Sequence, residues 1–285
     1  MTLGNGYRPD IDGLRAISVV MVLAFHAKLP FVPGGFVGVD VFFVMSGYLI
    51  SKLLLDEFNS NGRISVLGFW ARRVRRLAPA LLLVIVAVLA SSVFIQERIS
   101  GEVGGLAKGA LATMLINANH FFLNESGDYF GASAEANPLL HMWSLSVEEQ
   151  FYLAWPLVLF HSLKHLGVNR TRYVTLLILC ASFGISCYWT FTDSSKAFYL
   201  MPSRAWELMA GALLAFSSAK GRMQLGRTTV QAMGWGGLIV IVISVMFLSG
   251  QKAFPGPAAV LPVCGALLLL AAGASATVTS VSGFL

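Results

Sequence analysis

Long apolar runs recur along the chain and are separated by short polar stretches. We place eight of them at residues 14–31, 36–55, 77–95, 142–163, 172–191, 203–218, 230–248 and 257–275. Helical runs of about 18 or more apolar residues can cross about 30 Å of hydrocarbon. The runs are continuous rather than alternating, which argues against a transmembrane β-barrel. The pattern predicts an all-α fold, a polytopic transmembrane helical bundle forming one domain over residues 1–285.

A weaker apolar stretch covers 104–124 and is interrupted by Lys108, Asn117, Asn119 and His120. With it, the chain has about 8–9 membrane segments. Lys and Arg concentrate on the cytoplasmic side of membrane proteins, so their distribution tests whether this stretch crosses the bilayer.

Suppose that the N-terminus is cytoplasmic and that 104–124 does not cross. Fourteen of the 20 Lys and Arg residues then lie inside, and the outer six are Lys28, Arg98, Lys108, Lys196, Arg204 and Lys252. A single crossing would change this division to 11 against 9. The charge bias therefore favours a re-entrant or interfacial 104–124 segment, which is tolerated where it lines a protein cavity.

The composition supports a membrane protein and narrows the possible partners. Only 12% of the residues are charged and 56% are hydrophobic, with a mean hydropathy of +0.72. Soluble domains contain about 25% charged residues. The net charge of +6 comes from basic residues beside the apolar runs, so we attribute it to orientation in the bilayer. We expect no nucleic-acid partner, and no spacing typical of metal ligands suggests a metal.

The first run, "DGLRAISVVMVLAFH", contains two ionisable residues, Arg15 and His26. Eleven residues make three helical turns plus about 20°, so the two share a face, about 16 Å apart. We expect His26 slightly past the midplane. Ionisable residues in a membrane are costly and mark functional sites by default, and an imidazole can act as a general base. The alternative is that Arg15 reaches to the interface and His26 is structural.

A cluster of four arginines precedes the third run in "ARRVRRLAPA": Arg72, Arg73, Arg75 and Arg76. It either anchors the span on the cytoplasmic side or binds anions, because guanidinium groups bind phosphate with two parallel hydrogen bonds. On a helix, Arg72 shares a face with Arg75 or Arg76, and Arg73 with Arg76. Coenzyme A, with its diphosphate and 3′-phosphate, would suit such a cluster.

The stretch "HMWSLSVEEQFY" places His141, Ser144, Glu148 and Tyr152 on one helix face. In the preferred topology Glu148 lies about 10 Å and His26 about 12 Å below the outer surface, so we expect the two at similar depth. Glu148 could instead be the structural partner of a buried arginine.

Three further charged residues lie in apolar runs. Asp40 either lines the cavity or caps the second run's helix, and we favour the cap. Arg204 and Glu207 have the spacing of an i,i+3 ion pair, for which we favour a structural role.

Five ordered motifs resemble the acyltransferase-3 family of membrane O-acyltransferases, notably the bacterial O-antigen O-acetylase type. They are "YRPDIDGLRAISVVMVLAFH", "GGFVGVDVFFVMSGYLIS", "FWARRVRRLAPA", "HMWSLSVEEQFYLAWP" and "PSRAWELMAGALLA". The resemblance implies acyl transfer, usually of acetyl, from a cytoplasmic donor to extracytoplasmic sugars. The family's Arg-x10-His pair falls on Arg15 and His26. Its Arg-x-x-Arg element fits Arg72 with Arg75 and equally Arg73 with Arg76, and its Arg-x-x-Glu element falls on Arg204 and Glu207.

The resemblance implies catalytic roles for His26, Glu148 and Arg15. His26 would be a base or a covalent acyl carrier. Substrate or donor binding is expected from the remaining motif residues, namely Arg72, Arg73, Arg75, Arg76, Asp40, His141, Trp143, Ser144, Tyr152, Arg204 and Glu207. We expect acetyl-CoA as co-substrate without a permanently bound cofactor, a cell-envelope polysaccharide or glycolipid such as O-antigen as acceptor, and the bacterial inner membrane as location.

Two other functions compete with this interpretation. A transporter or flippase would also place His, Glu and Arg in the membrane. A non-catalytic binding subunit is the third alternative. The chain ends at "TVTSVSGFL", whereas family members continue with further helices and often with an SGNH-hydrolase-like domain. We therefore expect a C-terminally incomplete domain, with a missing C-terminal domain or a separate hydrolase-like partner.

Overall fold

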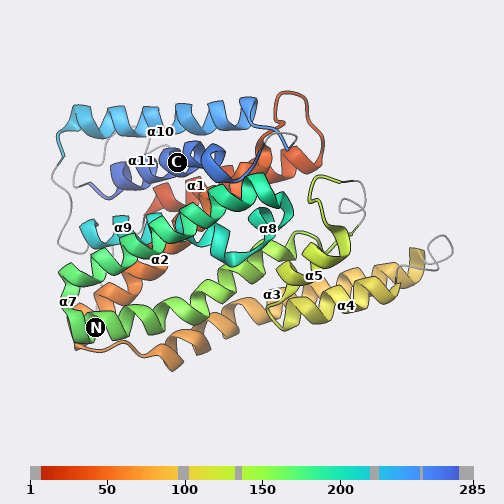
Figure 1. Ribbon diagram of the computed structural model, residues 1–285, viewed down its shortest axis with the longest axis horizontal. Coiled ribbons are helices and arrows are strands. Elements are labelled where there is room, and N and C mark those ends of the chain that lie inside the picture. Colours follow the sequence, from red (N-terminus) through yellow and green to blue (C-terminus); the bar gives the residue numbers. More distant parts are fainter. Residues whose placement is uncertain (1–7, 96–102, 132–136, 219–224, 251–252, 276–285) are drawn as a thin grey trace.

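The computed structural model describes residues 8–95, 103–131, 137–218, 225–250 and 253–275. Each of the eight predicted runs falls on a helix, which confirms an all-α bundle (Figure 1). Arg98, Lys220, Arg222 and Lys252, which entered the charge count, lie outside the described residues, as does the end of the chain. The helices are α1 (Pro9–His26), α2 (Gly38–Asn61), α3 (Val66–Ile95), α4 (Val103–Met114), α5 (Ala118–Ser126), α7 (Met142–Thr192), α8 (Ser194–Tyr199), α9 (Met201–Ser218), α10 (Arg227–Phe247) and α11 (Val260–Gly273), with short 3-10 turns η1 (Gly35–Val37) and η3 (Gly256–Ala259).

Five of the described segments are long and apolar enough to cross a membrane: Gly35–Asn61, Val66–Ser92, Met142–Thr192, Arg227–Phe247 and Gly256–Gly273. The third of these is α7, which is folded in two at Gly167, where φ is 75° and ψ is 168°. That backbone conformation is almost restricted to glycine. The two halves of α7, 142–166 and 168–192, therefore run back along each other (Figure 1). The protein is a multi-pass membrane protein.

The centre of the bundle is the crossing of α2 with α9, against which α7 packs. A Cβ atom on Gly47 would lie 1.8 Å from the carbonyl oxygen of Leu208, and one on Gly211 would lie 1.9 Å from that of Val44. Small residues allow helix backbones in membranes to approach this closely. Figure 1 shows α10 and α11 on one side of this centre and α3 with α4 on the other.

The 104–124 segment forms a helical hairpin and not a single crossing. The helix breaks between α4 and α5, where Ile116 has a φ of 57°, and Gly109 packs against the ring of Phe121. At 1.5 Å per residue α4 and α5 are about 18 and 14 Å long, too short to span a bilayer. The tip is held against α7, because Gln150 Nε2 donates to the carbonyl oxygen of Ile116 at 2.9 Å and Ala118 N donates to Ser146 Oγ at 3.1 Å.

The connections gather at two ends of the bundle (Figure 1). The α2–α3 turn and the fold of α7 at Gly167 lie at one end. The segment after α1, the loop before α7 and α8 lie at the other. Arg63, Lys164 and Arg170 belong to the first end, which is the end that the charge distribution predicts to be cytoplasmic.

One predicted boundary was wrong, and one helix extends beyond the run predicted for it. The first run was placed at 14–31, but α1 ends at His26. Pro30 and Pro33 follow, and Lys28 and Phe31 have positive φ values of 52° and 68°. Proline lacks the N–H that a helix needs, and the residue before it is disfavoured in helical conformation. The third run was placed at 77–95, but α3 begins at Val66, so the arginine cluster lies within the helix.

Candidate functional site

His26 is the last residue of α1, and its ring has a defined tautomer. Its Nδ1 atom lies 2.8 Å from the carbonyl oxygen of Val22. A carbonyl oxygen can only accept, so Nδ1 carries the hydrogen, and in the neutral ring Nε2 is the basic nitrogen. The ring of Phe25 meets the imidazole edge to face at 5.4 Å. The His26 side chain is thus oriented by its own helix and keeps one nitrogen for chemistry.

His141, the residue before α7, shares a cavity with His26. Partial burial of the imidazole of His141 lowers its pKa below 6.5, although the residue keeps an exposed surface, and the nearby His26 lowers the pKa further. A hydrogen bond to the backbone of Pro138 acts in the opposite direction. His141 is therefore expected to be neutral near pH 7 and able to exchange protons with a ligand.

The cavity has a volume of about 540 Å³ and is lined by residues at the end of α1 and just before α7, at the end of the bundle opposite the fold of α7 at Gly167. Ligand pockets in proteins measure about 300–1,000 Å³. Aromatic, histidine, amide and lysine side chains form its wall, which consists of Phe25, His26, Lys28, Tyr129, Phe130, Asn137, Pro138, Leu140, His141 and Gly250. This cavity can therefore hold a polar ligand against two imidazoles.

Glu148 lies further along α7, about 10 Å from His141 at 1.5 Å per residue. Its Oε1 atom accepts hydrogen bonds from Ser46 Oγ on α2 and from the hydroxyl of Tyr152 one turn away. The predicted shared face of Glu148 and Tyr152 is confirmed. The residue that the structure places beside His26 is His141, and Glu148 is held by α2 and α7.

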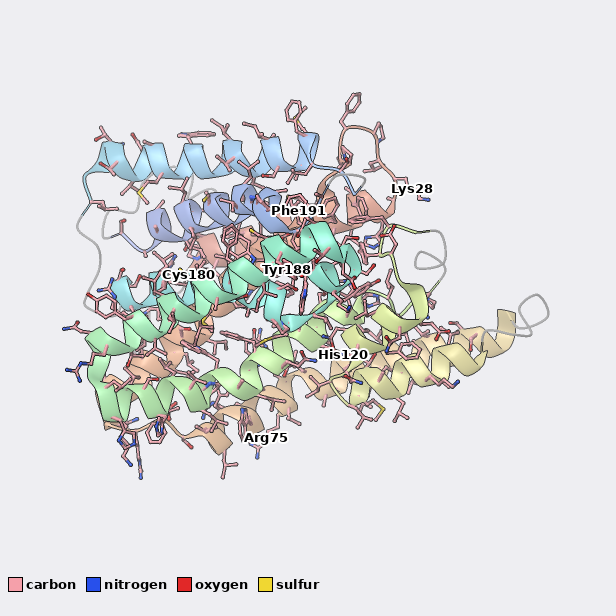
Figure 2. All side chains as sticks on the ribbon, in the orientation of Figure 1. Lys28, Arg75, His120, Cys180, Tyr188 and Phe191 are labelled. Carbon is pink, nitrogen blue, oxygen red and sulfur yellow. The ribbon has the colours of Figure 1, made fainter. Side chains whose placement is uncertain are left out.

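The arginine cluster divides into one inward and three outward side chains. Arg73 points into the bundle, where its guanidinium lies 4.1 Å from the centre of the Tyr152 ring and 3.3 Å from Glu149. Arg72, Arg75 and Arg76 are exposed, and Arg72 lies 3.7 Å from Glu57. In Figure 2 the labels of Arg75 and of Lys28, which is close to His26, lie on opposite sides of the bundle.

Asp40, Arg204 and Glu207 form a buried ionic network. Arg204 lies 3.2 Å from Asp40 and 2.9 Å from Glu207, and all three side chains are at most 1% exposed. Four rings surround the guanidinium at 5.4–5.8 Å from their centres, those of Phe43, Trp143, Phe198 and Phe254. The network connects α2 with α9, and its position supports the structural role favoured for Arg204 and Glu207.

The prediction that Asp40 caps α2 was wrong. The residue preceding α2 is Val37, and no side chain caps the helix there. The turn η1 leads directly into α2, so Asp40 already lies inside the first helical turn. Its carboxylate is fully buried and paired with Arg204, which Asp40 meets because α2 and α9 cross closely.

The remaining predicted residues lie away from the two histidines or contact only their own segment. Arg15, eleven residues before His26 on α1, pairs with Asp12 at 3.1 Å, and its side chain is 38% exposed. Ser144 Oγ donates to the carbonyl oxygen of His141 at 3.1 Å. Trp143 is 1% exposed, in the aromatic core beside Arg204.

Some residues of the site were not predicted from the sequence. Ser46 interrupts an apolar run, a signal that was visible but not used. Tyr129 and Asn137 line the cavity from the connection between α5 and α7, where no periodicity marks them. Gln150, which holds the hairpin tip, directly follows the two glutamates of the motif.

Several proteins whose names describe them as O-acetyltransferases, one of them putative, are similar to this chain. It is 36% identical over 246 residues to "Peptidoglycan O-acetyltransferase OatA" of Listeria monocytogenes, covering 85% of this chain and 39% of that protein. It is 37% identical over 215 residues to "O-acetyltransferase OatA" of Staphylococcus aureus, covering 74% and 34%. "Putative peptidoglycan O-acetyltransferase YrhL" of Bacillus subtilis is 32% identical over 263 residues, covering 89% and 41%. The chain thus spans well under half the length of these relatives.

No solved structure matches the chain. The family model described as "Acyltransferase domain" matches residues 8–279, nearly the whole chain and every helix described above. The protein therefore belongs to the acyltransferase-3 family.

Proposed function

We propose that this protein carries out the membrane step of peptidoglycan O-acetylation. It would take acetyl from acetyl-CoA at the cytoplasmic face and deliver it to a hydroxyl group of a glycan strand outside. The names of two relatives support peptidoglycan as the acceptor. We therefore propose peptidoglycan in place of the O-antigen expected from the sequence motifs. The identity of the donor, acetyl-CoA, and that of the acceptor, peptidoglycan, are both part of what we propose.

The observation that carries the proposal is the pair of histidines at one cavity. His26 and His141 come from segments more than 100 residues apart and line the same space of about 540 Å³. The tautomer of His26 leaves Nε2 as a base, and the pKa of His141 is lowered. General acid–base catalysis needs such groups within reach of the reacting hydroxyl.

The chemistry of the step follows from these groups. The basic Nε2 of His26 removes the proton of the acceptor hydroxyl while the oxygen attacks the thioester carbonyl. The new C–O bond forms, the C–S bond breaks, and the proton on the imidazole is passed to the departing thiolate. His141 would hold the acceptor or share the proton with His26. Each proton and electron pair then ends on coenzyme A thiol or on the ester, and the protein returns to its starting state.

The phosphate groups of the donor would be held at the other end of the bundle, and the rest of coenzyme A would extend from there toward His26. Arg72, Arg75 and Arg76 are exposed in the first half of α3, toward the end that contains the fold of α7 at Gly167. Guanidinium groups recognise phosphates by charge and by paired hydrogen bonds. Arg73 is occupied by Glu149 and Tyr152, so it would support the site from within the bundle.

The experiment is complementation of a strain that lacks the gene. Mass spectrometry of its glycan strands should show loss of O-acetyl groups, and the full-length gene should restore them. His26→Gln should not restore them. His161→Gln is the matched control, because His161 is an exposed histidine of α7 outside the cavity. Unchanged acetylation in the deletion strain would contradict the proposal.

Turnover of acetyl-CoA distinguishes the proposed function from that of a transporter or flippase. Membrane vesicles that contain the protein should release coenzyme A thiol from acetyl-CoA only when a glycan acceptor is present. A flippase would move the glycan without consuming acetyl-CoA, and that result would replace the proposed function.

A further inference from the structure

The face of α1 that carries Arg15 and His26 is open along its length. Val19 and Val22 lie between these two residues, and their spacing places all four on one helix face. Each of the four is exposed or half-buried, and Val19 is 45% exposed. The two ionisable residues of α1 are therefore joined by an open apolar strip. Because α1 packs against α2, this strip borders α2.

The neighbouring helices α2 and α7 have open faces as well. The half-buried residues in the first half of α2 recur every three or four positions, at Val39, Phe42, Ser46 and Leu49. On α7, Leu145 and Glu148 are half-buried and continue the face of His141. The cavity joins His26 of α1 to His141, and Ser46 of α2 contacts Glu148. The three open faces therefore meet between the two histidines and the arginine cluster.

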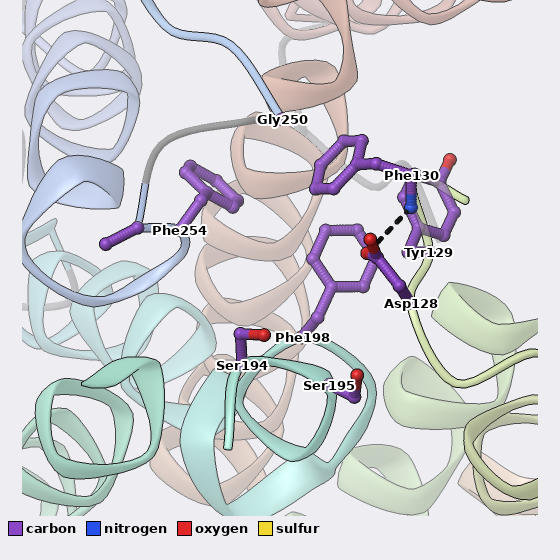
Figure 3. Close-up of a pocket in the computed structure, with 9 residues that line it drawn as sticks. Asp128, Tyr129, Phe130, Ser194, Ser195, Phe198, Gly250 and Phe254 are labelled. Atoms are coloured by element: carbon purple, nitrogen blue, oxygen red, sulfur yellow. Dashed lines mark hydrogen bonds between the residues drawn. The ribbon is translucent and has the colours of Figure 1, made fainter. Parts of the chain in front are cut away.

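The wall of the cavity toward α8 is packed with aromatic rings. The ring of Tyr129, which lines the cavity, stacks on that of Phe198 in α8 at 4.3 Å, and the two residues are 7% and 4% exposed. Asp128 Oδ1 accepts a hydrogen bond from the backbone N–H of Phe130 at 3.1 Å and holds this loop (Figure 3). A long ligand that reaches His26 from the arginine cluster therefore has its room along α1, α2 and α7.

Glu148 offers a hydrogen-bond acceptor on this path. Its Oε1 atom accepts from Ser46 Oγ and from the hydroxyl of Tyr152, so the side chain is held by α2 and α7. Among the described residues no group donates to its Oε2 atom, and the residue is half-buried. A carboxylate oxygen away from bulk water is costly unless it receives a hydrogen bond. Glu148 is therefore suited to a ligand that has N–H groups.

The arm of coenzyme A that joins its diphosphate to its sulfur fits this path in length and chemistry. It contains two amide groups and about 12 bonds, which span about 14 Å when extended at about 1.2 Å per bond. Arg73 marks the level of the arginine cluster, because its guanidinium lies 4.1 Å from the centre of the Tyr152 ring. Tyr152 is about 16 Å from His141 along α7. An arm whose phosphates are held at that level therefore brings its sulfur to the two histidines.

Glu148 is about 10 Å from His141 along α7. The amide nearer the diphosphate is about seven bonds, or about 8 Å, from the sulfur, and the other amide is about 4 Å from it. We propose that Glu148 Oε2 accepts a hydrogen bond from the N–H of the amide nearer the diphosphate, and that this bond positions the acetyl thioester between His26 and His141. The inference rests on the proposed function and names the residue that holds the donor arm. Glu148 is then a positioning residue.

The test is calorimetric titration of the full chain in lipid nanodiscs with two probes. One is coenzyme A, and the other is adenosine 3′,5′-bisphosphate, which has phosphates but no arm. Glu148→Leu removes both carboxylate oxygens, so it should bind coenzyme A about tenfold more weakly than the wild type and the bisphosphate equally well. Glu125→Leu, at an exposed glutamate of α5, is the matched control and should bind both probes as the wild type does. Equal affinity of the wild type and Glu148→Leu for coenzyme A would overturn the proposal.

A coenzyme A analogue tests the same bond from the ligand side. Replacing the amide nearer the diphosphate by an ester removes its N–H. The wild type should bind this analogue about tenfold more weakly than coenzyme A, whereas Glu148→Leu should bind the two equally, because it has already lost the bond. If Glu148→Leu also loses affinity for the bisphosphate, its fold is altered and the wild type decides. Equal binding of coenzyme A and the analogue by the wild type would then overturn the proposal.

Transfer assays separate this inference from the proposed function. If Glu148 and the amide are coupled in binding but no acetyl is transferred to glycan, the role of Glu148 is supported and the proposed function fails. If acetyl is transferred but the coupling is absent, the role of Glu148 is overturned and the proposed function stands. A wild-type protein that does not bind coenzyme A would overturn both.

Discussion

His26 ends α1 and His141 directly precedes α7, and the two histidines line one cavity although 115 positions separate them. Their pairing depends on two helix boundaries that meet at the same end of the bundle. Neither histidine is in the middle of a described helix. The consequence is a site at the mouth of the bundle, where a glycan can enter without crossing the hydrocarbon.

Replacing each histidine by glutamine tests how the pair works. Glutamine keeps hydrogen-bonding capacity but does not titrate near neutral pH. We expect His26→Gln to reduce acetyl transfer by about 10²–10⁴-fold, the usual contribution of a general base. His141→Gln should have a smaller effect. If both act on one hydroxyl, the double variant should lose less than the product of the single losses.

The measurement is transfer of radiolabelled acetyl to glycan in vesicles, corrected for the amount of inserted protein. A His26→Gln variant with near-normal transfer would show that this histidine is structural. Strictly multiplicative losses would show that the two histidines act independently.

The pKa of His141 predicts how stability changes with pH. Partial burial of the imidazole and the neighbouring His26 hold this pKa below 6.5 in the folded protein. Between the lowered value and 6.5 the unfolded chain binds a proton that the folded chain does not, so stability decreases as the pH falls through this range. Thermal unfolding in detergent between about pH 7 and pH 5 should show the decrease.

The decrease should be smaller in His141→Gln and unchanged in His161→Gln, the exposed histidine of α7. An identical pH dependence in wild type and His141→Gln would contradict the assignment to His141.

The exposed arginines of α3 should affect donor binding only. Replacing Arg75 or Arg76 by glutamine should raise the KM for acetyl-CoA about two- to fivefold, because exposed ion pairs contribute about 0.2–1 kcal/mol. The effect should shrink at high salt, since exposed charges are screened. Initial rates at low and high salt measure both. Arg227→Gln, an exposed arginine at the start of α10, is the control. Unchanged KM values for both variants would leave only an anchoring role for the cluster.

The buried network predicts a large effect on stability. Arg204→Met leaves the carboxylates of Asp40 and Glu207 buried without their cation. Removing one partner of such a network typically costs about 3–5 kcal/mol. Replacing all three with apolar residues (Asp40→Leu, Arg204→Met, Glu207→Leu) should recover most of this loss. Thermal unfolding of the purified variants tests both. A triple variant less stable than Arg204→Met would show that the network has a role beyond charge balance.

The topology predicts which face each loop reaches. A tag at Asn169, beside the fold of α7 at Gly167, should be reached by reagents only from the cytoplasmic side. One at Gly131, in the loop before α7, should be reached only from outside. Labelling of intact cells and of inverted vesicles measures this. External labelling at Asn169 would show that the α4–α5 segment changes the side of the following helices.

The eight apolar runs could be located from the sequence because a membrane helix needs an unbroken apolar segment. Their ends were less predictable. The end of α1 depends on prolines and positive φ values after His26, which a hydropathy pattern does not weigh. For the same reason, the depth expected for His26 in the membrane predicted Glu148 as its neighbour. The observed helix boundaries place His141 beside His26 instead.

The partners of charged side chains could be predicted only within one helix. The i,i+3 spacing of Arg204 and Glu207 is visible in the sequence, and the structure contains that pair. Asp40 completes the network from another helix, which depends on the close crossing at Gly47 and Gly211. The four arginines of α3 are likewise equivalent in sequence, and only the packing of α7 selects Arg73 to face inward.

The hairpin of α4 and α5 also constrains the order of biogenesis. Its tip depends on Ser146 and Gln150, and Asn119 donates to the carbonyl oxygen of Tyr199, so all these partners are later in the chain. When the ribosome has completed the hairpin, none of them has been synthesised. Unpaired backbone groups are not stable in hydrocarbon. We therefore expect the hairpin to insert only after the second half of α7 and α8 have been synthesised, although it is translated before them.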